Sequence, residues 1–182
     1  AAAARLHFGV DFTDEAFYAT LPYRFVLGDT PYVSDLGVAQ NAGVLATPLV
    51  WIWIAITSDN GGLILFLRYA YLGMRVGIFL LAVWALWRRV PHRLGVAAPL
   101  LVCSFVLFGI PTLSYNTVAA SAVTAALLSL LLGSERGNGA FAVMAFVCAA
   151  IAAYSHPGLA PVAIAIGVAI VLRAPNTGGR RI

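Results

Sequence analysis

The sequence predicts an all-α protein, a polytopic bundle of transmembrane helices with an external, juxtamembrane amphipathic helix segment. Of its 182 residues, 62% are hydrophobic and only 10% are charged, against about 25% charged residues in a typical soluble domain. The apolar residues come in runs of roughly 15 to 25, the length that crosses about 30 Å of hydrocarbon. A mean hydropathy of +0.92 is too high for a soluble core, because so short a chain has little interior.

The basic residues fit a membrane protein better than a nucleic-acid-binding one. All 11 are arginines, and the net charge is +4. Most lie at the ends of apolar runs, where the positive-inside rule places them, so no nucleic-acid partner is predicted. Cys103 and Cys148 lie inside apolar runs and are expected to be small buried side chains without a disulfide. No metal-ligating spacing, phosphate loop or dinucleotide fingerprint is present, so no cofactor is predicted with certainty, although a divalent metal is compatible with the sequence.

Residues 1–61 predict an external loop with juxtamembrane helices and a partly inserted helix. Five of the seven acidic residues lie in this region, before residue 42. Thr13 is a suitable N-cap, and Asp14 and Glu15 follow it in the first helical turn, where the helix dipole favours acids. We therefore expect a helix to begin here and to lie at the membrane surface.

The rest of this first helix is marked by its apolar stripe and its end. Phe17, Leu21 and Phe25 recur at four-residue spacing, which places them on one face. Pro22 is expected to disrupt the helix, because proline lacks an N–H group, and Gly28 suits the helix end.

Residues 42–57 are apolar but short for a membrane span. Pro48 lies in the middle, and Trp51 and Trp53 lie near the centre. Because tryptophan prefers the membrane interface, a partly inserted helix is the first interpretation and a true span is the second.

Residues 62–173 predict a bundle of five transmembrane helices. The strongest span covers residues 62–87, and the shorter ones cover residues 94–110, 117–133, 140–156 and 158–172. Residues 174–182 are interpreted as a cytoplasmic tail or loop of a chain that extends further.

Charge predicts the orientation of the bundle. If the joints between spans alternate, the joints at residues 111–116 and around His156 share one side and carry no arginine. The other side, which we expect to be cytoplasmic, receives Arg88, Arg89, Arg93, Arg136, Arg173, Arg180 and Arg181. The acidic segment is then external if residues 42–57 do not span the membrane, and internal if they do.

The adjacent carboxylates Asp14 and Glu15 are the first candidates for chemistry. A transferase that acts on a hydroxyl needs a base to accept the proton as the oxygen attacks, and a carboxylate at the mouth of a membrane cavity can serve. The alternative is that both acids only suit the start of a helix.

Two arginines lie inside the strongest span. Arg68 and Arg75 are seven residues apart, about two turns, and so share a face. A membrane arginine costs several kcal/mol and is a functional candidate by default, with a lipid phosphate as a suitable partner. Arg68 has the alternative of extending to the nearby interface, whereas Arg75 is deeper.

Three polar residues lie at the non-cytoplasmic ends of other spans. Tyr115, Asn116 and His156 can face one cavity together with the acidic segment. The structural alternatives are that Asn116 caps the helix that starts at Thr117, and that His156 is an interfacial residue before Pro157.

The order of these features resembles the C-type glycosyltransferases of membranes, in particular the protein O-mannosyltransferase and aminoarabinose transferase group. The likeness covers about residues 9–173, corresponding to the N-terminal half of such enzymes. It rests on the Asp-Glu pair with a tyrosine at residues 13–18, on Gly28-Asp29, and on the apolar segment at residues 42–57. A long helix with an outer arginine, Arg68, and a closing arginine pair follows. Two positions differ: Gln40 lies near where the group often has a lysine, and residues 156–158 replace a Lys-Gly.

The resemblance implies roles for the candidate residues. Asp14 would be the base or would position the acceptor, with Glu15 beside it in the catalytic site. Arg68, with Arg75 and His156, would bind the donor phosphate. The residues that bind substrate would be Tyr18, Tyr115 and Asn116. The resemblance also places the acidic loop outside the membrane.

The function expected from this resemblance is transfer of a sugar from a polyprenyl-phosphate donor to an acceptor hydroxyl on the non-cytoplasmic side. The acceptor would be a glycan, a lipid or a protein, and the surroundings would be the lipid of a bacterial inner or plasma membrane. One alternative is a multi-pass transporter or a component of a lipid flippase that uses the same buried charges. A membrane scaffold without chemistry is another, but it would leave Arg75 unexplained.

Overall fold

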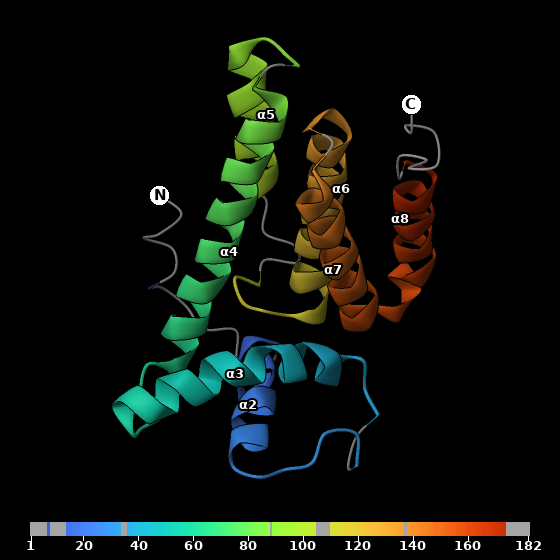
Figure 1. Ribbon diagram of the computed structural model, residues 1–182. Helices are drawn as coiled ribbons and strands as arrows, with labels where there is room; N and C mark the ends of the chain where they lie inside the picture. Colours follow the sequence, from blue (N-terminus) through green and yellow to red (C-terminus); the bar gives the residue numbers. More distant parts are fainter. Residues whose placement is uncertain are drawn as a thin grey trace.

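The computed structural model describes residues 7, 14–33, 36–87, 89–104, 110–136 and 138–173. Within these ranges the chain is helical and has no strand, which confirms the all-α prediction. The elements in chain order (Figure 1) are α2 (Asp14–Val26), α3 (Ala39–Thr57), α4 (Leu63–Leu86), α5 (His92–Ser104), α6 (Tyr115–Arg136), α7 (Gly139–Ser155), the 3-10 helix η2 (Pro157–Leu159) and α8 (Ala160–Arg173).

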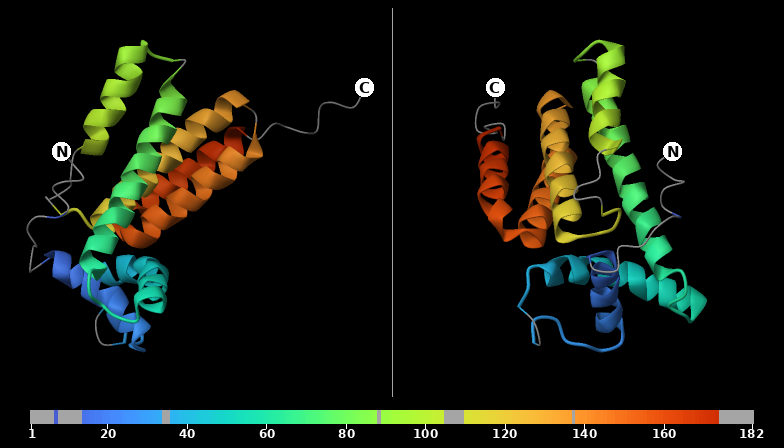
Figure 2. Two further views of the ribbon diagram at one scale, coloured as in Figure 1. Left: turned by 90° about the vertical axis from the view of Figure 1, so that its left-hand side faces the viewer. Right: turned by 180° about the vertical axis from the view of Figure 1, so that it is seen from behind.

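Helices α4 to α8 run alongside one another, and α2 and α3 lie at one end of this bundle (Figures 1 and 2). Helix α3 runs across the bundle axis, and α2 lies at a steep angle to α3. Three described helices are long and apolar enough to cross a membrane, namely α3, α4 and α6. The chain therefore has the helices of a membrane protein. Helix α3 is not parallel to α4 (Figure 1).

Helix α2 differs from its prediction in the middle and agrees with it at the end. Pro22 lies inside α2 without ending it, so the predicted disruption is wrong. The helix stops where Gly28 adopts a φ of 107°. The N–H of Gly28 donates to the carbonyl of Phe25, and that of Asp29 donates to the carbonyl of Arg24. This bond pattern is a Schellman motif, and Gly28 takes the left-handed backbone conformation it requires. Thr13, the predicted N-cap, lies outside the described residues.

Helix α6 begins before the residue predicted to cap it. It starts at Tyr115, so Asn116 is in its first turn and does not cap a helix from Thr117. Ser114 and Thr117 close the end instead. The Thr117 N–H donates to Ser114 Oγ at 3.2 Å, and the Ser114 N–H donates to Thr117 Oγ1 at 2.8 Å. The two residues thus form a reciprocal cap, in which a threonine takes the usual place of glutamate.

Small side chains bring α6 and α7 together. The buried residues on the facing sides of these two helices are Ala122, Ala126, Ser129, Ala145, Ala149 and Ala152. Near the connection, a Cβ added to Gly133 would lie 3.1 Å from the Cβ of Phe141. Small residues let helix backbones approach closely, which is how membrane helices gain van der Waals contact in lipid.

A second core joins α2 and α3 to the bundle. Side chains of α2, α3 and α4 meet the segment before α6 in a cluster made of Ala19, Ala46, Val50, Leu63, Leu67, Tyr71 and Leu113. Gly43 of α3 allows α2 to come close, because a Cβ there would lie 3.0 Å from Phe25 Cε2. This core fixes α2 against the end of α4.

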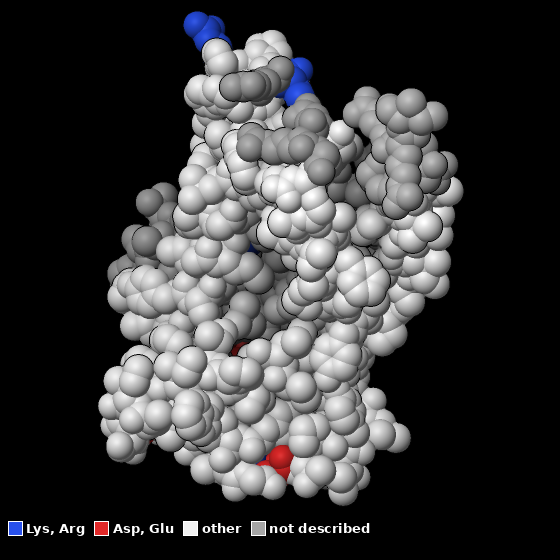
Figure 3. Space-filling view, viewed as in Figure 1, with Lys and Arg blue, Asp and Glu red and all other residues white. Residues whose placement is uncertain are grey.

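Charge is separated between the two ends of the molecule. In the face shown in Figure 3, arginine side chains project at the α5 end and acidic side chains lie at the opposite end, near α2. Helix α6 starts beside α2 and ends at Arg136, 21 residues further on, or about 32 Å at the usual helical rise. The acidic and arginine-rich segments are thus at opposite ends of the bundle, the arrangement predicted for the case in which residues 42–57 do not span the membrane.

Candidate functional site

A buried ion pair joins the acidic segment to the bundle. Arg68 Nε donates to Glu15 Oε1 and Arg68 Nη2 donates to Glu15 Oε2, both at 2.5 Å. The side chains are 6% and 1% exposed, respectively. A bidentate pair of this kind fixes orientation as well as neutralising charge. Arg68 therefore points toward the acidic segment.

The position of Glu15 follows from how α2 packs. Its buried side includes Glu15, Ala19 and Leu21, and the latter two pack among apolar side chains. An isolated carboxylate or guanidinium in such surroundings would be costly, so each group needs the other. Arg68 is five residues into α4, about 8 Å from its start, which places it level with α2.

Asp14 lies next to this pair but faces outward. It is exposed, whereas Glu15 is 0% exposed. Its carboxylate is close enough to act on Tyr18, one turn along α2. Burial, above all, raises the pKa of Tyr18 to about 12, and the neighbouring Tyr115 and Asp14 add to this by Coulomb interaction. Asp14 is therefore a carboxylate at the surface of the site, beside a phenol that stays protonated.

A row of rings connects α2 to the ends of α6 and α7. The rings of Tyr18 and Tyr115 have centroids 6.1 Å apart, and those of Tyr115 and His156 are 5.6 Å apart. Three residues named from the sequence thus meet at one end of the bundle. Asn116 is half-buried in the first turn of α6.

His156 presents a buried polar atom to this row. Its Nδ1 is buried, and no described residue forms a hydrogen bond with it. The ring lies over Gly158, where an added Cβ would be 3.1 Å from both Nδ1 and Cε1. The backbone at His156 is extended and separates α7 from η2. His156 thus lies in an extended residue position between two helices, and Gly158 leaves room for its ring.

Arg75 lies away from these residues. Its guanidinium donates to the carbonyl oxygens of Val102 and Cys103, near the C-terminal end of α5. The side chain is buried and faces α5. Arg75 thus ties α4 to α5 through backbone acceptors. It is about 10 Å further along α4 than Arg68 at the usual helical rise, and the structure does not bring it to the row of rings.

A polar network beside the site was not predicted. Tyr32 Oη lies 2.6 Å from Tyr154 Oη and donates to Asn41 Oδ1 at 2.8 Å. Asn41 Nδ2 in turn donates to the carbonyl of Tyr154 at 2.6 Å. Gln40, noted in the sequence as a replacement for lysine, accepts the Tyr32 N–H at 2.7 Å. These contacts hold Tyr32 in a backbone conformation with a positive φ of 66°. No signal in the sequence marks this conformation.

The described residues contain no group of three or more His, Cys, Asp or Glu side chains suited to a metal ion. Comparison of the chain with models of known protein families finds no match. Comparisons with curated proteins and with solved structures find no match either. The functional assignment therefore depends on the residues and geometry of the α2 end.

Proposed function

We propose that the protein is a membrane glycosyltransferase that moves a sugar from a polyprenyl-phosphate donor to an acceptor hydroxyl. One observation carries the proposal: the buried Glu15–Arg68 pair anchors α2 so that Asp14 is exposed at the end of the bundle. The row of Tyr18, Tyr115 and His156 starts from the same helix. A carboxylate, aromatic surfaces and a buried imidazole are suited to an acceptor hydroxyl, a sugar and a phosphate, respectively.

The proposed reaction is a displacement at the sugar. The acceptor oxygen forms a bond to the anomeric carbon as the bond from that carbon to the phosphate oxygen breaks. The acceptor proton goes to the Asp14 carboxylate, which acts as general base. The electron pair of the broken bond stays on the polyprenyl phosphate, which leaves as the second product.

The geometry changes the roles expected of the basic residues. Glu15 already balances the charge of Arg68, so Arg68 is a positioning residue that holds α2. Arg75 ties α4 to α5 and is also structural. His156 is the group proposed to donate to the departing phosphate, because its Nδ1 is buried without a hydrogen-bond partner among the described residues. Tyr115 and Tyr18 are proposed to line the sugar site, with Asn116 beside them.

The setting of this reaction is part of the proposal. We propose a multi-pass protein of the cell membrane, with the α2 end on the non-cytoplasmic side and the arginine-rich end in the cytoplasm. Helix α3 then lies in the outer interface, where its exposed Trp51 suits the lipid headgroups.

The test of this function is the Asp14→Asn variant. In membranes from cells that express the protein, wild type should transfer labelled sugar from a polyprenyl-phosphate sugar. Asp14→Asn should lower the rate by at least about a hundredfold, the usual contribution of a general base, while protein abundance stays the same. Asp29→Asn is the matched control, because Asp29 is an exposed acid at the other end of α2 that pairs with Arg24.

Two outcomes would contradict the proposal. Wild-type turnover in Asp14→Asn would remove the base. Absence of transfer by the wild type with every polyprenyl-phosphate sugar tried would favour the transporter or flippase alternative, for which buried arginines in α4 are the supporting observation.

A further inference from the structure

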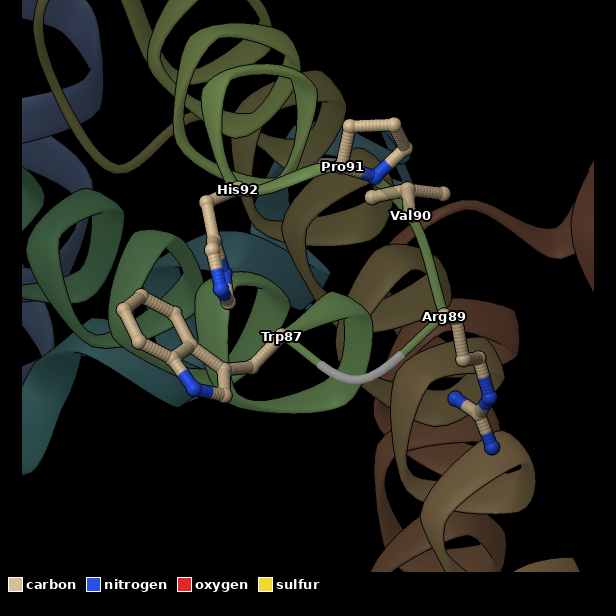
Figure 4. Close-up of a pocket in the computed structure, with 5 residues that line it drawn as sticks. All are labelled: Trp87, Arg89, Val90, Pro91 and His92. Carbon is tan, nitrogen blue, oxygen red and sulfur yellow. The ribbon is translucent and has the colours of Figure 1, made fainter.

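A cavity lies at the arginine-rich end of the bundle, opposite the site described above. Its volume is about 450 Å³, and the joint between α4 and α5 forms it. The lining residues are Trp87, Arg89, Val90, Pro91 and His92 (Figure 4). Figure 4 shows the Trp87 and His92 side chains together on one side and Arg89 directed to the other. The cavity therefore combines an aromatic wall with basic groups.

The two basic lining residues, Arg89 and His92, come from a short stretch of sequence rich in arginine. Residues 88–93 contain three arginines and His92, with no acid among them. The His92 ring packs on Trp87 with centroids 4.7 Å apart, which fixes the imidazole at the cavity. Arg93 is exposed next to it.

Arg89 gives this joint a fixed shape. Its Nη1 donates to the carbonyl of Ala85 at 2.8 Å, and its Nη2 donates to the carbonyl of Leu131 at 3.0 Å. The first of these bonds holds the arginine to the end of α4, and the second ties the joint to α6. The cavity is therefore formed by a braced connection between three helices.

Away from the joint, α4 and α5 expose large apolar side chains. Leu80, Trp84 and Leu101 of α4 and α5 are 59%, 46% and 73% exposed. A ligand that fits both regions has an anionic head and hydrocarbon chains. Tryptophan at this level marks the membrane interface, where phospholipid phosphates lie.

We propose that the α4–α5 joint binds the headgroup of an anionic phospholipid of the cytoplasmic leaflet. The phosphate lies in the cavity beside His92 and Arg93, and the acyl chains lie along the exposed side chains of α4 and α5. Basic cavities at the cytoplasmic ends of membrane helices suit anionic headgroups for this reason. The site takes a structural lipid and is separate from the proposed donor site at the other end.

The test measures which lipid lies next to Trp84 and Trp87. The Trp51→Phe/Trp53→Phe protein, in which these are the remaining tryptophans, is placed in mixed bilayers of phosphatidylcholine and phosphatidylglycerol. Brominated lipid quenches tryptophan on contact. At equal brominated fraction, brominated phosphatidylglycerol should quench more than brominated phosphatidylcholine. Loss of Arg93 in Arg93→Gln should lower this preference about fivefold, the contribution of one arginine at a membrane surface.

Arg24→Gln is the control, because Arg24 is an exposed arginine at the opposite end of the molecule. It should leave the preference unchanged. Equal quenching by the two lipids, or an equal loss in Arg24→Gln and Arg93→Gln, would overturn the proposal. Loss of the preference on adding inorganic phosphate would also overturn it, because the site would then take free phosphate.

If the tryptophan substitutions unfold the protein, native mass spectrometry of the wild type and Arg93→Gln provides the same comparison. Retained phosphatidylglycerol that is lost in Arg93→Gln supports the site, and equal retention overturns it.

Discussion

The Glu15–Arg68 pair makes a prediction that a double-mutant cycle can test. Arg68→Met leaves the Glu15 carboxylate, which is 0% exposed, without its partner. Removing one member of a buried pair costs about 3–5 kcal/mol, because the remaining charge stays desolvated. Glu15→Leu should cost a similar amount by leaving the guanidinium unpaired. The double variant, which removes both charges, should differ from wild type by only about 1 kcal/mol or be more stable.

The measurement is the free energy of unfolding in detergent, followed by the loss of helical circular dichroism. The cycle through Arg24 and Asp29 provides the control. That pair is also short, at 2.6 Å, but its side chains are 50% and 44% exposed. An exposed pair contributes only about 0.2–1 kcal/mol, so the control cycle should show a small coupling. If Arg68→Met cost as little as Arg24→Gln, or if the double variant lost the sum of the two single losses, the pair would not be the anchor of α2.

Three further predictions concern the site and the bundle. Gly158→Ala should displace the His156 ring, whose atoms lie 3.1 Å from the new Cβ, and raise the donor KM severalfold. Gly139→Ala is the control, because a Cβ there meets nothing within 4 Å, and it should leave the donor KM unchanged. Equal KM values for both variants would contradict this prediction. The pKa of Tyr18 should be about 12 instead of 10.0. Protonated Tyr18 therefore stabilises the fold below pH 10, and this contribution is lost as the pH rises to about 12. The difference in tyrosinate absorbance between wild type and Tyr18→Phe gives this pKa, and a value near 10 would refute the prediction. Ala126→Leu should lower the free energy of unfolding by about 1–3 kcal/mol through overpacking, and an unchanged value would mean that α6 and α7 do not pack at this position.

The long apolar helices could be predicted because their signal is local. Helix α4 runs from Leu63 to Leu86, within a residue of each predicted boundary. An uninterrupted apolar run needs no tertiary information to be recognised. Helix boundaries that depend on side-chain geometry were harder to predict from the sequence. Asn116 looked like a cap, but Ser114 and Thr117 take that role, and two hydroxyl residues three positions apart give only a weak signal.

The partners within the site could not be predicted for a different reason. Adjacent residues of a helix point about 100° apart, so only one of Asp14 and Glu15 can face α4. Which of the two does so depends on the rotation of α2 about its axis, and packing of α2 against α3 and α4 sets this rotation. The partner of Arg75 is likewise set by where the end of α5 lies. The network around Tyr32 joins residues up to 122 positions apart, and nothing in the local sequence pairs them.

The closely packed α6 and α7 have a consequence for how the protein reaches its fold. Only two residues separate the helices, so their contacts are local in sequence, and local contacts form fast. We expect α6 and α7 to enter the bilayer as one helical hairpin during synthesis. Tyr115 and His156 lie at the same end of this hairpin, so two of the three rings in the row would be assembled with it. The earlier segment α2 would then complete the site by docking onto a surface that is already formed.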